Sequence, residues 1–98
     1  MFDGLSIMTS FFAEFVHTSD GVTCSDSGLL DLSTEEECSD AVDYAKSFNS
    51  DARYQSEVYL STSPKGCIIY HSGSMYFNTY ATGDRNNSYS SICRKGNT

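Results

Sequence analysis

The sequence predicts a small α+β domain in which one main helix packs on an antiparallel sheet and two disulfides brace the fold. Three observations support this fold class: one amphipathic helical segment, several short aromatic-rich segments separated by Gly and Ser turns, and four cysteines in 98 residues. A chain of this length is expected to form one domain with a modest core. We divide it into an apolar N-terminal arm or first strand, residues 1–16, and a disulfide-stapled α+β domain, residues 17–98.

The first expected strand lies within residues 10–19, where Phe11 and Phe15 would share one face of the sheet. A short helix is the alternative, but the aromatic content and the Ser-Asp-Gly turn that follows favour a strand. The next stretch, residues 24–32, is rich in Ser, Asp and Gly and is expected to be a loop.

The main helix is predicted within residues 32–48, "LSTEEECSDAVDYAKSF". Ser33 can cap its start, and Glu36 completes a capping box. The acidic first turn suits the positive end of the helix dipole. One stripe at helical spacing would face the core, and it consists of Cys38, Ala41, Val42, Ala45 and Phe48.

A strand is predicted at residues 54–60, and a β-hairpin follows it. If Ser72 and Gly73 form a two-residue loop, Tyr70 lies opposite Met75. A loop one residue longer would change which side chains share a face.

The last part of the chain is expected to form a long polar loop, residues 81–91, and a short closing strand, residues 92–94. The loop holds an Asn-Asn-Ser sequon, which makes Asn86 a candidate acceptor for N-glycosylation.

Four cysteines, Cys24, Cys38, Cys67 and Cys93, are an even number without a C-x-x-C pair, so two disulfides are favoured over a metal or redox site. Three pairings are possible. We prefer Cys38–Cys67 with Cys24–Cys93, because the first bond would join helix to sheet and the second would close the domain near its ends. Free thiols in a cytosolic protein are the alternative.

The net charge of −7 and the pI near 4.4 argue against nucleic-acid partners, and no apolar run is long enough for a membrane span. Residues 1–49 carry ten acidic and one basic residue, whereas residues 50–98 carry three acidic and five basic residues. This unequal distribution of charge between the two halves of the sequence suits head-to-tail association of copies. The first residues do not resemble a signal peptide, so a fragment of a larger secreted protein is one reading.

The motifs "STEEEC", "PKGC", "MYFN" and "SICR" together resemble small cysteine-rich modules, often repeated, in secreted or surface proteins of algae and other protists. The resemblance implies an extracellular setting and a paired-cysteine framework, and it supplies no catalytic residues. It covers about residues 24–94 and rests on Cys24, Glu37, Cys38, Ala41, Pro64, Gly66, Cys67, Tyr76, Phe77, Asn78, Ile92, Cys93 and Arg94.

No catalytic residues, cofactor or metal are predicted. His17 and His71 are the only histidines, and neither has a nucleophile at a recognisable spacing. Calcium is a weaker alternative, because two loops are rich in oxygen ligands, but neither loop matches an EF-hand. The first contains Asp20, Asp26 and Asp31, and the second contains Asp84, Asn86 and Asn87.

We therefore expect a non-enzymatic extracellular structural or interaction module, which could be a self-assembling subunit. Its partners would be copies of itself, other extracellular proteins or glycans. The alternative is a carbohydrate-binding module that uses exposed tyrosines and the 81–91 loop, and a secreted hydrolase fragment or inhibitor comes third. The candidate interaction residues are aromatic: Phe11, Phe12, Phe15, Tyr70, Tyr76 and Tyr80.

Overall fold

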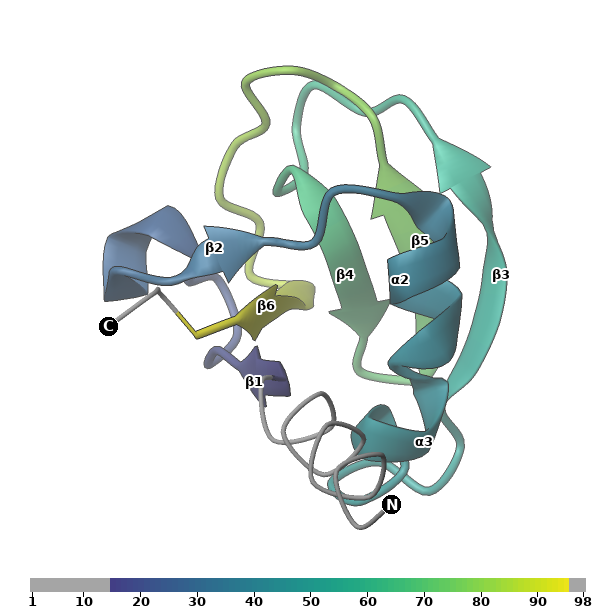
Figure 1. Cartoon of the computed structure of the whole chain (residues 1–98). Coiled ribbons are helices and arrows are strands. Elements are labelled where there is room, and N and C mark those ends of the chain that lie inside the picture. Colours follow the sequence, from purple (N-terminus) through teal and green to yellow (C-terminus); the bar gives the residue numbers. More distant parts are fainter. Residues whose placement is uncertain (1–14, 96–98) are drawn as a thin grey trace, which may run out of the picture.

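A computed structural model describes residues 15–95 of the chain, and Figure 1 shows the arrangement of its elements. Two short α-helices and a short 3-10 helix accompany a six-stranded sheet. The elements are β1 (Phe15–His17), η1 (Ser25–Ser27), β2 (Leu30–Asp31), α2 (Glu35–Asp40), α3 (Val42–Ala45), β3 (Arg53–Val58), β4 (Gly66–Tyr70), β5 (Ser74–Asn78) and β6 (Tyr89–Arg94). None of the helices in this range is long and apolar enough to cross a membrane.

The sheet is mixed, so the expectation of a purely antiparallel sheet is wrong. Its strand order is β1-β6-β4-β5-β3, with β2 also paired to β6. All pairs are antiparallel except β3 with β5. The cause is the connection after β3, which carries the chain past the position of β5 before β4 begins. Because β5 then folds back against β4, it runs in the same direction as β3.

Asn78 stabilises this crossing connection. Its side chain is buried, its Nδ2 donates to the carbonyls of Leu60, Ser63 and Pro64, and its Oδ1 accepts from the amide of Leu60. One amide side chain thus satisfies several backbone groups of a segment without regular secondary structure.

Two short helices replace the single main helix that the sequence predicted. The chain departs from helical geometry at Ala41, where ψ is −2°, and α2 ends there before α3 begins. Ser39 and Asp40, which precede the break, favour helix ends over helix interiors. The cap also differs from the prediction by one position: Thr34 Oγ1 accepts from the amide of Glu37, so Ser33 is not the N-cap residue.

The helices α2 and α3 cover one face of the sheet, which we call the first face, and the core lies between this face and the helices. Cys38, Ala41 and Ala45 are fully buried on the helix side, whereas Val42 is half-buried and Phe48 is exposed. The predicted stripe is therefore confirmed for Cys38, Ala41 and Ala45, confirmed only in part for Val42, and wrong for Phe48. On the sheet side the core contains Cys67, Ile69, Met75, Phe77 and Ile92.

Two disulfides join the layers, and their pairing is the one preferred from the sequence. Cys38–Cys67 connects α2 to β4, and Cys24–Cys93 connects the residue before η1 to β6. The four cysteines are almost completely buried.

The β4–β5 hairpin has a longer loop than expected. Ile69 pairs with Met75, so Tyr70 does not lie opposite Met75. This shift by one residue changes the composition of both faces. Met75 and Phe77 join Cys67 and Ile69 on the helix-covered face, and Tyr76 moves to the same face as Tyr70.

Two further segments differ from the sequence expectation. The stretch expected to be a loop contains η1 and β2, and β2 pairs with the end of β6. The last strand begins at Tyr89 instead of Ile92, so the polar loop is shorter than residues 81–91. The added residues bring Tyr89 into the sheet.

Candidate functional site

The four expected aromatic interaction residues that the structure describes lie in three separate places. Phe15 is buried in the core, where its ring centroid lies 5.8 Å from that of Tyr44. Phe11 and Phe12 lie outside the described residues. Tyr80 packs edge-on against Tyr59, at 4.9 Å between centroids.

Tyr70 and Tyr76 converge with a third tyrosine, Tyr89, on the second face of the sheet. Tyr70 on β4 pairs with Tyr89 on β6, and their ring centroids are 5.5 Å apart. The centroid of Tyr76 on β5 lies 6.4 Å from that of Tyr89. All three side chains are partly exposed, whereas Ile68, which lies on β4 opposite Tyr76, is fully buried on the same face. We call these three residues the tyrosine face.

The hydroxyl groups of the tyrosine face have no hydrogen-bond partner among residues 15–95. Burial raises the pKa of Tyr89, and the neighbouring Tyr76 and Tyr70 raise it further. Each phenol hydroxyl of the tyrosine face can both donate and accept a hydrogen bond.

A cation lies in the same cross-strand row as two of the tyrosines. Arg53 on β3 pairs with Ser74 on β5, and the β4–β5 register continues from Ser74 to Tyr70 and on to Tyr89. The guanidinium of Arg53 donates to the carbonyls of Asp51 and Ser72 and to Ser74 Oγ. These acceptors are neutral, so no carboxylate neutralises Arg53 within the described range.

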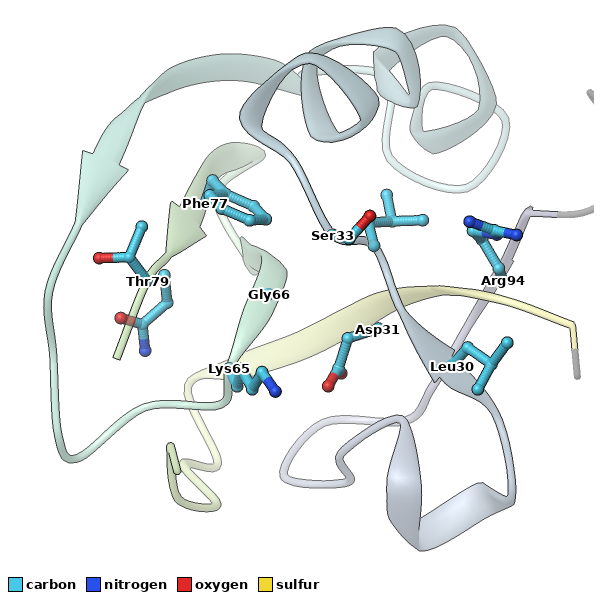
Figure 2. A pocket seen from close by; sticks show the side chains of 10 residues that line it. Leu30, Asp31, Ser33, Lys65, Gly66, Phe77, Thr79 and Arg94 are labelled. Carbon is cyan, nitrogen blue, oxygen red and sulfur yellow. The ribbon is translucent and has the colours of Figure 1, made fainter. Parts of the chain in front are cut away.

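A groove on another part of the molecule is the second candidate site. It lies between β2 and the adjoining ends of β4 and β5, and its cavity volume is about 650 Å³. Figure 2 shows that Asp31 and Lys65 point toward one another across it, with the Phe77 ring directed inward. Its lining combines apolar side chains, among them Leu32 and Phe77, with a few charged groups, a combination typical of small-molecule sites.

Asp31 and Lys65 also line a smaller neighbouring cavity of about 390 Å³, which Asp84 and Arg85 border on its other side. Burial raises the pKa of Asp31, and the positive charge of Lys65 partly opposes this effect. The side chain of Asp31 makes no hydrogen bond within the described range. The two cavities form a polar groove of mixed charge that could hold a hydroxyl-rich or zwitterionic molecule.

Two of the loop carboxylates considered for calcium, Asp26 and Asp84, accept hydrogen bonds within the described range, and Asp84 Oδ1 accepts from the backbone amide of Arg85. Arg85 donates two hydrogen bonds to Asp26, at 2.9 and 2.6 Å, and these bonds lower the pKa of Asp26 to about 2. Within residues 15–95, no three His, Cys, Asp or Glu side chains are grouped in a way that could hold a metal ion.

Asn86, the candidate glycosylation acceptor, has a structural contact. Its Nδ2 donates to the carbonyl of Thr62 at 3.0 Å, and its Oδ1 accepts from the amide of Ser88. Glycosylation of Asn86 stays a prediction, and an attached glycan would have to leave these bonds intact or replace them.

The two histidines lie apart from the groove. His17 stacks on Phe48 with ring centroids 3.7 Å apart, and its Nδ1 is 2.8 Å from the hydroxyl of Tyr44. Partial burial lowers the pKa of His17. His71 packs on Tyr70 at the rim of the tyrosine face, at 4.0 Å between centroids.

Two residues of the tyrosine face and its row were missed from the sequence: Tyr89 and Arg53. Tyr89 was assigned to the polar loop, although its alternation with Ser91 and Cys93 is typical of a strand. Arg53 gave no usable signal, because its position beside the tyrosines depends on the parallel pairing of β3 with β5.

Comparison of the chain with protein-family models, with curated proteins and with solved structures gives no match.

Proposed function

We propose that this protein is a non-enzymatic extracellular interaction module that contacts its partners through the tyrosine face. The observation that carries the proposal is the convergence of Tyr70, Tyr76 and Tyr89 from three adjacent strands, with hydroxyls that have no hydrogen-bond partner among residues 15–95. Tyrosine is enriched at interfaces because it offers apolar area, a polar group and little conformational entropy to lose.

The scaffold supports this proposal. Cys38–Cys67 fixes the helix layer to β4, and Cys24–Cys93 holds β6, so both strands that carry Tyr70 and Tyr89 are covalently anchored. Disulfides of this kind are typical of small proteins in oxidising compartments, which favours an extracellular location.

The first partner we propose is a second copy of the chain, which would make the protein a self-assembling subunit. The unequal charge of the two halves of the sequence favours head-to-tail contact between copies. Residues 1–14, which the sequence suggested as a docking arm, lie outside the described residues.

Sedimentation velocity over a wide concentration range tests this partner. The proposal expects the wild-type protein to associate, Tyr76→Ser to weaken the association, and the matched variant Tyr59→Ser to leave it unchanged. Tyr59 is a suitable control because it is 71% exposed and packs on Tyr80 instead of the tyrosine face. A wild-type protein that is monomeric at every concentration would exclude copies as partners.

Carbohydrate binding is the second candidate function, and the partly exposed aromatic rings on three adjacent strands favour it. The structure changes which residues would be involved. Tyr89 takes the place of Tyr80, and the polar loop contributes residues 81–85 to the smaller cavity of the groove.

A further inference from the structure

We propose that the tyrosine face binds an acidic saccharide, with sugar rings over Tyr70, Tyr76 and Tyr89 and a carboxylate held by Arg53. This inference rests on the proposed function, because it uses the same face and names the chemistry of its ligand.

The arrangement of the side chains suits an extended chain of sugars. Arg53, Ser74, Tyr70 and Tyr89 form one row across four neighbouring strands. Strands are about 4.8 Å apart, so this row extends over roughly 14 Å. Tyr76 lies beside the row, two residues along β5 from Ser74. The site is therefore an elongated surface for several ligand units.

The chemistry of the tyrosines also matches a saccharide. A sugar ring presents C–H groups on its faces and hydroxyls around its edge. The three tyrosines offer aromatic rings for the C–H groups and phenol hydroxyls for the edge. Because these hydroxyls have no partner within the described range, a ligand would not have to displace an existing hydrogen bond.

Charge favours an acidic sugar over a neutral one. The protein carries −7 overall, yet Arg53 is the only charged side chain that β3, β4, β5 and β6 place on this face. Its three hydrogen bonds go to neutral acceptors, and its Nε–H has no partner among residues 15–95. A guanidinium with free donors is well suited to a carboxylate.

The groove fits an acidic ligand less well. Its two cavities are lined by three acidic and three basic side chains, namely Asp26, Asp31, Asp84, Lys65, Arg85 and Arg94, so their charges cancel. Arg85 and Arg94 are also already paired with carboxylates, with Asp26 and Glu37 respectively. Of the two candidate sites, the tyrosine face is the one whose charge complements an anion.

Isothermal titration calorimetry with hexagalacturonate, and with cellohexaose as the neutral probe, tests the proposal on the full chain with its disulfides intact. We expect binding of hexagalacturonate that weakens as salt is added. Tyr76→Ala and Arg53→Gln should each reduce the affinity about tenfold or more, whereas Tyr59→Ala should leave it within about twofold. Near-ultraviolet circular dichroism and the melting temperature verify that each variant is folded.

Two conservative variants keep the test decisive if a larger change unfolds the protein. Tyr76→Phe keeps the ring and removes the hydroxyl, and Arg53→Lys keeps the charge and removes the planar fork. Both should bind more weakly than wild type and more tightly than the Ala and Gln variants.

Three results would overturn the proposal. Failure of the wild-type protein to bind hexagalacturonate is the first, and equal binding of the two probes is the second. The third is binding that Asp31→Asn abolishes and Tyr76→Ala spares, which would place the ligand in the groove. If the protein self-associates through Tyr76 but binds neither saccharide, the proposed function stands and this inference fails.

Discussion

Tyr70 lies directly opposite Tyr89 across β4 and β6, with ring centroids 5.5 Å apart. This pair brings the β-hairpin and the last strand of the chain together in one surface. The surface therefore exists only when β6 is docked on β4. Cys93 lies on β6, so the disulfide to Cys24 stabilises the strand that supplies Tyr89.

Removal of either disulfide should destabilise the fold. The paired substitutions Cys38→Ala with Cys67→Ala, or Cys24→Ala with Cys93→Ala, should each lower the free energy of unfolding by roughly 2–4 kcal/mol. Chemical denaturation measures both losses. The Cys24–Cys93 bond closes the longer loop, with a sequence separation of 69 against 29, so its removal should cost at least as much.

The oxidation state of the four cysteines can be measured directly. Thiol titration of the denatured, unreduced protein should find no free thiol, because all four cysteines are paired. Four reactive thiols would contradict both the disulfide framework and the extracellular location.

Asn78→Ala should be strongly destabilising. The substitution leaves the buried carbonyls of Ser63 and Pro64 without their side-chain partner, and we expect a loss of roughly 2–4 kcal/mol in unfolding free energy. Asn87→Ala is the matched control, since Asn87 is exposed, and its effect should stay within about 0.5 kcal/mol. Equal effects of the two variants would mean that Asn78 does not organise the crossing connection.

The Asp26–Arg85 ion pair should make stability depend on acid pH. The pKa of Asp26 is lowered to about 2 in the folded protein from an ordinary value of 3.8, chiefly by its hydrogen bonds from Arg85. The ionised form therefore stabilises the fold above pH 3.8, and this stabilisation is lost as the pH falls toward 2.

Melting temperatures measured between pH 5 and pH 2 test this dependence. They should fall more steeply for wild type than for Asp26→Asn, and added salt should reduce the difference. Asp43→Asn, at an exposed position on α3, serves as the control and should follow the wild-type profile. Parallel curves for wild type and Asp26→Asn would show that the ion pair contributes nothing.

The sequence predicted the features that local patterns determine. The acidic helix start before Cys38, the turn before Cys67 and the even number of cysteines were enough to suggest the disulfide pairing found in the structure. The hairpin strands were located nearly correctly, because their apolar residues are bounded by Gly and Ser on both sides.

Features that depend on distant contacts could not be predicted in this way. The parallel pairing of β3 with β5 follows from a connection whose path depends on the hydrogen bonds of Asn78. The register of the hairpin depends on one additional loop residue before Ser74. Because Tyr76 and Arg53 reach the tyrosine face only through these two features, the composition of the site could not be read from spacing alone.

The most direct test of the account is a two-dimensional 1H–15N NMR titration of the full chain with trigalacturonate. The account predicts that the largest chemical-shift changes occur at residues 68–70, 74–76 and 89–91, with Arg53 Nε–H among the side-chain signals that move. Changes confined to the groove around Asp31 and Lys65, or no changes at millimolar ligand, would contradict the assignment of the tyrosine face as the binding surface.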